Sequence, residues 1–165
     1  DQLINHEAFI HVATTLNGRQ QTNVKILGAK TGSITKTQEG LAVFSEFITG
    51  CIDVNRMYRI SDRVIAIQMA IDGADFIEVY RFFLKRDGKT RTQAFEDARR
   101  VFRGGVLTGG APFTKDMVYL DGLFRVHNFF RSAILRGKIN AIEILFSGKV
   151  DLDDVSERLD MNVAH

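Results

Sequence analysis

The sequence contains a single proline, Pro112, among 165 residues, and this scarcity constrains the fold more than any other feature. Proline breaks or kinks a helix when it falls in the interior, so a chain almost without it can form long helices. Alternating apolar and polar runs, which strands require, are few, and 14 glycines supply breaks between the helical segments. We therefore expect a mainly α-helical protein.

Start and stop signals divide the chain into consecutive helices. Thr35 and Gln38 have the T-x-x-Q spacing of a capping box, Ser61 is a suitable first-turn cap, and Gly50 is placed to end a helix. The segment VKIL at 24–27 is either a short strand or a buried connector, because periodicity does not distinguish the two. The expected helices span about residues 3–16, 37–49, 61–71, 75–86, 92–103, 115–136, 140–148 and 153–159.

Composition excludes several classes of protein. With Cys51 as the only cysteine, no internal disulfide can form, which fits a reducing compartment, and we expect a cytoplasmic protein. A net charge of +2 is too small to indicate nucleic acid or a membrane as partner, and no apolar run approaches the length of a membrane span. The absence of repeats and linkers predicts a single domain over residues 1–165. Because Asp1 replaces an initiator methionine, we expect a piece of a longer protein.

The most informative pattern is H-E-x-x-x-H, formed by His6, Glu7 and His11 on the first predicted helix. In the usual H-E-x-x-H motif the imidazoles are four residues apart and reach one metal ion, whereas a spacing of five separates them by about 140° on a regular α-helix. A π-type turn would return His6 and His11 to the same face. The motif therefore predicts an unusual backbone at this point.

A third ligand is available in the second predicted helix. Two histidines leave a catalytic zinc ion one protein ligand short, and Glu39 can complete the set. Gly40 would allow two helix backbones to approach closely there, and Glu7 would remain off the metal as general base for a water on the ion. The alternative interpretation is ordinary: surface or core histidines, and a Glu39 that stabilises a helix dipole.

Several linked segments resemble a known family. The combination of NHEAFIH, TQEGLAVFSE, VFRGG and APFTKDMVYLDGLFRVHNF is similar to the tubulin tyrosine carboxypeptidases and their bacterial relatives, the flavohemoglobin expression-modulating QEGLA-motif proteins, long described as a domain of unknown function. The resemblance extends through most of the chain.

The resemblance implies a zincin-like helical metallopeptidase with one zinc ion. Its ligands match His6, His11 and Glu39, and its catalytic glutamate matches Glu7. The implied substrate is the C-terminal tail of a peptide or protein, which is an acidic tubulin tail for the eukaryotic members. Family members have a substantial region before the metal helix, so we expect this chain to be a carboxy-terminal fragment that lacks the upstream part.

Other residues are candidates for substrate contacts. Residues 85–103 hold seven Lys or Arg against three Asp or Glu, and Arg103, next to a glycine pair, is our candidate anchor for a terminal carboxylate. Lys115 and Tyr119, four residues apart, should share a helix face, where Tyr119 could donate a hydrogen bond to the oxyanion. His127 could assist binding. The alternative for the basic residues of 85–103 is a solvated helix face, and the alternative for His127 is a hydrogen-bonded histidine in the core.

Two other functions compete with a zinc carboxypeptidase. One is a non-catalytic helical regulatory or interaction module that retains the metallopeptidase scaffold. The other, nucleic-acid binding through Arg99 and Arg100, has little support because the basic segment is short and poor in aromatic residues. The sequence assigns no oligomeric state.

Overall fold

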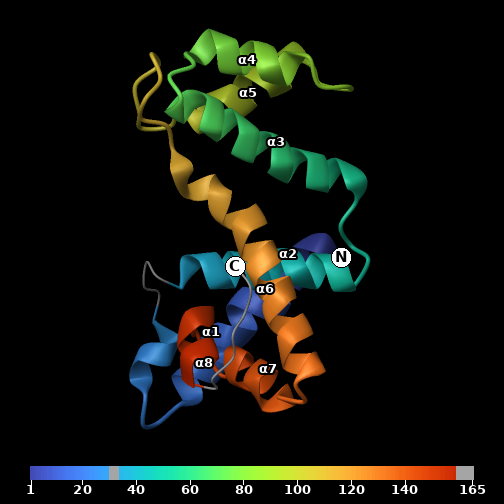
Figure 1. Cartoon of the computed structure of the whole chain (residues 1–165), viewed down its shortest axis with the longest axis vertical. Coiled ribbons are helices and arrows are strands. Elements are labelled where there is room, and N and C mark those ends of the chain that lie inside the picture. The colour runs from blue at the N-terminus through green and yellow to red at the C-terminus, as the bar shows by residue number, and fades with distance from the viewer. Residues whose placement is uncertain (30–33, 159–165) are drawn as a thin grey trace. The chain divides into compact units, whose positions relative to one another are not determined.

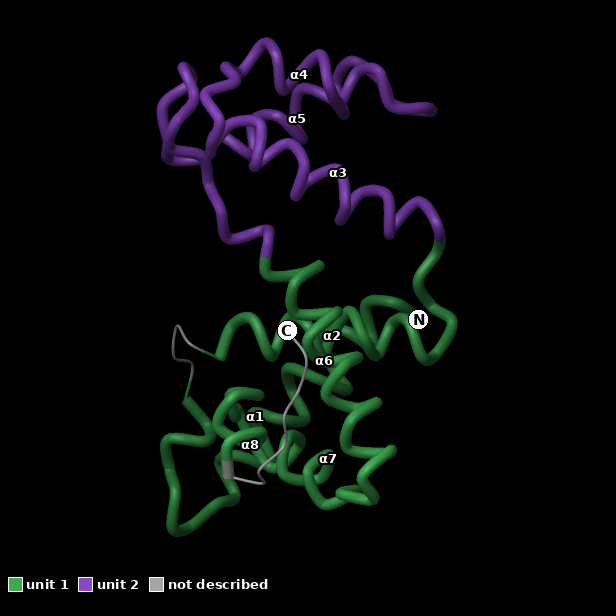
Figure 2. Tube along the Cα trace, in the orientation of Figure 1, with its two compact units in different colours: residues 1–53, 118–165 green, residues 54–117 purple. Residues whose placement is uncertain are grey.

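The computed structural model describes residues 1–29 and 34–158, and helices are the only regular secondary structure in that part of the chain (Figure 1). The predicted mainly α-helical class is therefore confirmed. The chain divides into two compact units, which are coloured separately in Figure 2. Unit 1 comprises residues 1–53 and 118 onward, and unit 2 comprises residues 54–117. The expectation of a single domain stays a prediction.

Unit 1 carries both ends of the chain. It begins with a π-helix, η1, and the long helices α2 and α6 form its most extensive helix pair. The segment VKIL, expected as a strand or connector, contributes to a short 3₁₀ helix, η2. The elements of unit 1 are η1 (Ile4–Val12), α1 (Ala13–Gln20), η2 (Lys25–Gly28), α2 (Thr35–Ile48), α6 (Val118–Leu135), α7 (Ile139–Phe146) and α8 (Leu152–Arg158).

The crossing of α2 and α6 depends on two glycines. A Cβ atom built on Gly40 would lie 2.7 Å from the Cα atom of Gly122, and one built on Gly122 would lie 2.8 Å from the Cα atom of Gly40. Carbon atoms in contact are normally 3.5–4.0 Å apart, so no side chain fits on either helix at this point. The prediction that Gly40 permits close backbone approach is confirmed, and the backbone it meets is that of α6.

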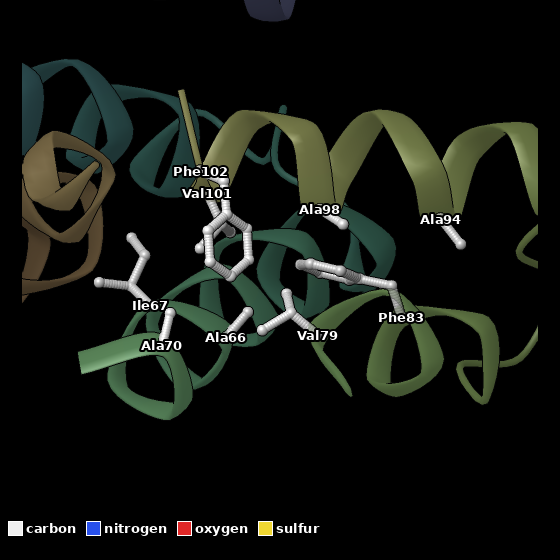
Figure 3. Close-up of a cluster of buried hydrophobic side chains, with 9 residues drawn as sticks. All are labelled: Ala66, Ile67, Ala70, Val79, Phe83, Ala94, Ala98, Val101 and Phe102. Atoms are coloured by element: carbon white, nitrogen blue, oxygen red, sulfur yellow. The ribbon is translucent and has the colours of Figure 1, made fainter. Parts of the chain in front are cut away.

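Unit 2 is a continuous stretch that builds its own core. It contains α3 (Val54–Ile71), α4 (Phe76–Leu84), α5 (Arg91–Val101) and η3 (Thr114–Met117). Figure 3 shows how small side chains such as Ala66 and Ala98 let the three α-helices approach, while Phe83 and Phe102 fill the space between them. Phe83 is only 2% exposed and is one of the largest fully enclosed side chains of this core.

Capping residues fix several helix ends in unit 2. Asp75 forms a reciprocal capping box with Glu78 at the start of α4, and Thr90 does the same with Gln93 at the start of α5. Ser61, expected to begin a helix, instead lies within α3, where its hydroxyl donates to the carbonyl oxygen of Met57 at 2.8 Å. The prediction was wrong because serine can bond back to the preceding turn as readily as it caps.

The start of α2 also differs from expectation. The helix begins at Thr35, and its N-cap, Ile34, makes no side-chain capping bond. Gln38, expected to complete a capping box with Thr35, accepts hydrogen bonds from Thr14 at 2.9 Å and from Lys149 at 3.2 Å. These partners come from distant parts of unit 1, so tertiary contacts override the local pattern.

The C-terminal end of α2 lies where the sequence predicts it. Gly50 adopts a φ of 67°, which favours glycine. Its N–H donates to the carbonyl of Phe47 at 3.1 Å, and the next N–H, of Cys51, donates to the carbonyl of Glu46 at 2.9 Å. These two bonds form a Schellman motif, so Gly50 ends the helix as predicted.

The last predicted helix, 153–159, corresponds to α8, although Leu159 lies outside the described residues. Among the helices that the structure describes, none combines the length and the apolar character needed to cross a membrane.

Candidate metal centre

The H-E-x-x-x-H segment lies in a π-helix. Element η1 runs from Ile4 to Val12, and the N–H that follows it, of Ala13, donates to the carbonyl of Ala8, five residues earlier. Because this hydrogen-bond pattern links residues five apart, it brings side chains at that spacing to one face. The rings of His6 and His11 are accordingly 5.1 Å apart between centroids, with their planes at 74°. The predicted π-type backbone is confirmed and covers the whole motif.

Glu39 approaches both imidazoles from α2. Its Oε2 atom lies 3.4 Å from Nε2 of His6 and 3.6 Å from Nε2 of His11. The potential ligand atoms of these three residues all lie within 4.8 Å of one another. The side chains are 12–21% exposed, so the group is partly open to solvent.

The separations can be compared with those that zinc requires. Ligand atoms about 2.1 Å from a tetrahedral zinc ion lie about 3.4 Å from one another. The two distances from Glu39 are close to this value. A set of two imidazoles and one carboxylate is also typical of catalytic zinc sites, which keep a fourth position open. The donor set and its spacing therefore fit a zinc ion.

The electrostatics of the group depend on the contact between acid and imidazoles. Burial by itself would raise the pKa of Glu39, but hydrogen bonds from His11 and His6 lower it to about 2. Hydrogen bonds to Glu39 and Glu46 raise the pKa of His6 to about 9. Without a metal, His6 is therefore protonated at neutral pH, and any metal that binds it must displace that proton.

The sequence analysis missed one member of the site, Glu46. This residue is 0% exposed, and its Oε1 atom accepts a hydrogen bond from Nδ1 of His6 at 2.7 Å. Its Oε2 atom accepts from the amide of Gln2 at 2.8 Å. A signal was present in the sequence: Glu46 lies seven residues after Glu39, two helical turns along, and therefore on the same face of α2.

Polar contacts also attach η1 to the end of α2. The side-chain amide of Asn5 donates to Oγ1 of Thr49 and to Sγ of Cys51, both at 3.1 Å. The hydroxyl of Ser45 donates to the carbonyl oxygen of Asn5 at 3.2 Å. These contacts set the position of the π-helix along α2 and hence the position of the histidines relative to Glu39.

The remaining candidate residues do not join this group. Glu7 is exposed on η1, and Tyr119 is half-buried on α6. His127, whose structural alternative was a core histidine, is instead exposed on α6, with its ring 6.3 Å from that of Phe44. Lys115 lies in η3 and Tyr119 in α6, so the continuous helix face predicted for the pair is interrupted.

Arg103 and Lys115 are exposed residues of unit 2. The guanidinium of Arg103 lies 5.8 Å from the centroid of the Phe113 ring. Arg103 also lines a cavity of about 760 Å³ in unit 2, together with three further arginines, two acidic residues and apolar side chains. The catalytic and substrate-binding roles of Glu7, Tyr119, Arg103, Lys115 and His127 stay predictions.

Comparison with known proteins identifies the family of the chain. The described helices and the grouped histidines and carboxylate define a helical protein with a candidate metal centre. The family model described as microtubule-associated tyrosine carboxypeptidase matches residues 1–162, nearly the whole chain, and the chain belongs to this family. The resemblance found in the sequence is thereby confirmed. No curated protein and no solved structure matches the chain.

Proposed function

We propose that the chain is a zinc-dependent metallopeptidase of the carboxypeptidase type. The observation that carries the proposal is the placement of one oxygen of Glu39 at 3.4 and 3.6 Å from Nε2 of His6 and Nε2 of His11. The π-helix adds support, because a regular α-helix would separate these imidazoles. The family match supports carboxypeptidase chemistry.

Each residue of the motif has a distinct part in this mechanism. His6, His11 and Glu39 would hold the ion, and a bound zinc ion would polarise the scissile carbonyl and lower the pKa of a water toward about 7. Glu7, which is exposed and follows His6 in the H-E-x-x-x-H motif, would be the general base. It would accept the proton of the attacking water and deliver it to the leaving amine.

Substrate binding forms a separate part of the proposal. Arg103 would bind the terminal carboxylate, because a guanidinium can form two parallel hydrogen bonds with it. The cavity that Arg103 lines holds four arginines against two acidic residues, Glu96 and Asp97, together with apolar surface. This excess of positive charge and the apolar side chains would suit a peptide tail that ends in a carboxylate; the lining also includes Phe76, Phe102 and Leu107. The family description suggests the C-terminal tail of tubulin as the type of substrate.

The other candidates would also act on the substrate. Tyr119 would donate a hydrogen bond to the oxyanion that develops during attack, a contribution of roughly 3 kcal/mol in enzymes where such donors have been removed. His127, also on α6, would contact the substrate. Lys115 belongs to unit 2 and would contact the substrate there.

A second candidate function is a helical interaction module that retains the scaffold without catalysis. One observation favours it: Phe9, Val12 and Leu16 are each at least half exposed on η1 and α1. Apolar side chains exposed together are common where proteins associate. Peptide hydrolysis distinguishes this function from the proposed peptidase.

The proposal is tested by metal content and peptide digestion on the same preparations. Protein purified at neutral pH without chelator should contain about one equivalent of zinc, and less than a tenth of an equivalent would contradict the proposal. Glu7→Gln should keep the zinc but reduce release of the C-terminal residue from a peptide library at least about 100-fold, because it removes the general base.

Glu143→Gln provides a matched control, since Glu143 is an exposed glutamate on α7. It should hydrolyse the library as the wild type does. Zinc binding by the wild type without any peptide turnover would instead support the interaction module.

A further inference from the structure

A carboxylate without solvent contact lies within the helix that carries Glu39. Glu46 is 0% exposed and follows the buried residues Val43 and Phe44 in α2. Burial of a charged carboxylate costs several kcal/mol unless hydrogen bonds compensate. The position of Glu46 therefore depends on what it binds.

Glu46 is held by hydrogen bonds to its side chain and to its backbone. Its side chain accepts hydrogen bonds from His6 and Gln2, at 2.7 and 2.8 Å. Its backbone carbonyl accepts from the N–H groups of Cys51 and Ile52, at 2.9 and 3.1 Å, where α2 ends. The carboxylate is thus fixed in orientation as well as buried.

The contact with His6 determines which ring nitrogen can bind a metal. A carboxylate can only accept, so Nδ1 of His6 must carry the proton that it donates to Glu46. Nε2 is then left to face Glu39, from which it is 3.4 Å away. A ring flip would exchange the nitrogens for carbons and break the short bond to Glu46. The imidazole is therefore held in one orientation, between two carboxylates of the same helix.

The hydrogen bond between His6 and Glu46 is not needed merely to attach η1 to α2. Asn5 bonds to Thr49 and Cys51, and Ser45 bonds to the backbone of Asn5, so other polar groups already join the two helices. What Glu46 adds is a direct bond to a proposed ligand. Carboxylates that accept the second N–H of a metal-bound histidine fix its tautomer and increase its basicity.

We propose that Glu46 is a positioning residue that presents Nε2 of His6 to the metal, an inference that rests on the proposed zinc centre. The bond from Nδ1 of His6 selects the tautomer, and the bond from Gln2 keeps the carboxylate in place. Glu46 acts through His6 and does not bind the ion.

Zinc affinity measured by competition with a chromophoric chelator tests this role. Glu46→Gln keeps the shape and an acceptor but loses the charge, whereas Glu46→Leu removes every acceptor. Loss of such a supporting carboxylate weakens metal binding by about 10- to 100-fold. We expect zinc affinity to decrease in the order wild type, Glu46→Gln, Glu46→Leu, with at least a tenfold loss for Glu46→Gln.

The control variant is Ser45→Ala, which removes a bond between η1 and α2 without touching the imidazole. It should bind zinc within about twofold of the wild type, and circular dichroism should show equal helix content in all variants. Equal affinity of Glu46→Gln and the wild type would overturn the inference, and so would equal losses in Glu46→Gln and Ser45→Ala. A wild type that binds no zinc would instead overturn the metal centre itself, and this inference with it.

If the Glu46 variants do not fold, a measurement on the wild type alone can test the positioning role of Glu46. Nitrogen NMR of histidine-labelled, zinc-loaded protein reports which ring nitrogen of His6 is protonated. We expect protonated Nδ1 and metal-bound Nε2. Coordination through Nδ1 would overturn the inference.

Discussion

Gly40→Ala should destabilise the protein, although alanine is the better helix former. The new Cβ atom would lie 2.7 Å from the Cα atom of Gly122, and the obstacle is backbone that cannot rotate away. The helices α2 and α6 would have to separate by about 1 Å to restore normal carbon contacts. Overpacking of this kind costs about 1–3 kcal/mol, and a rigid obstacle favours the upper end. The gain in helix propensity returns about 1 kcal/mol.

We therefore expect a net loss of about 2 kcal/mol, which lowers Tm by about 4–8 °C for a chain of this size. Thermal unfolding followed by circular dichroism, with chelator present, measures this loss. Gly122→Ala should behave in the same way, because its Cβ atom would meet Gly40 at 2.8 Å. Arg131→Ala, at an exposed position of α6, is the control and should change stability by less than about 0.5 kcal/mol. A Gly40→Ala protein as stable as the wild type would refute the close crossing.

Three further predictions concern charged groups. In metal-free protein the raised pKa of His6, about 9 against 6.5, means that the folded state binds the proton more tightly. The protonated His6 therefore stabilises the folded state fully below pH 6.5, and this stabilisation is lost as the pH rises to about 9, by up to about 3 kcal/mol in the free energy of unfolding by urea. Glu39→Gln should flatten this pH dependence. An unchanged profile in that variant would contradict the ion pair. Asp75→Ala, which removes the capping box with Glu78, should cost about 1 kcal/mol, and an unaltered Tm would exclude a stabilising cap. Asp116→Ala deprives two arginines of a buried carboxylate and should cost about 2 kcal/mol; a smaller loss than for Asp75→Ala would argue against that pairing.

The sequence predicted those features that depend on spacing along one helix. The spacing of five positions from His6 to His11 required a π-type backbone if both residues were to bind one ion, and the structure has this backbone. Gly40 lies within an apolar helix, where glycine lowers helix stability. Its presence there implied that another helix backbone approaches closely. Gly50 ended α2 because a left-handed residue is needed at that point.

Features that depend on distant partners were not predictable in the same way. The T-x-x-Q pattern at Thr35 failed because Gln38 bonds to Thr14 and Lys149, which lie far away in the sequence. Glu46 was missed because its burial arises only when η1 lies against α2. The division into two compact units is not marked in the sequence by a proline-rich or glycine-rich linker.

The order of segments in the two units has a consequence for synthesis. Unit 2 is one uninterrupted stretch, whereas unit 1 is built from the beginning and the end of the chain. During translation, α2 leaves the ribosome before unit 2 and must wait for α6, its main packing partner, until unit 2 has been made. Unit 2 can fold as soon as it emerges, since domains generally fold as they are completed. The face of α2 that packs against α6 meanwhile stays uncovered, so the nascent chain should bind general chaperones through this helix.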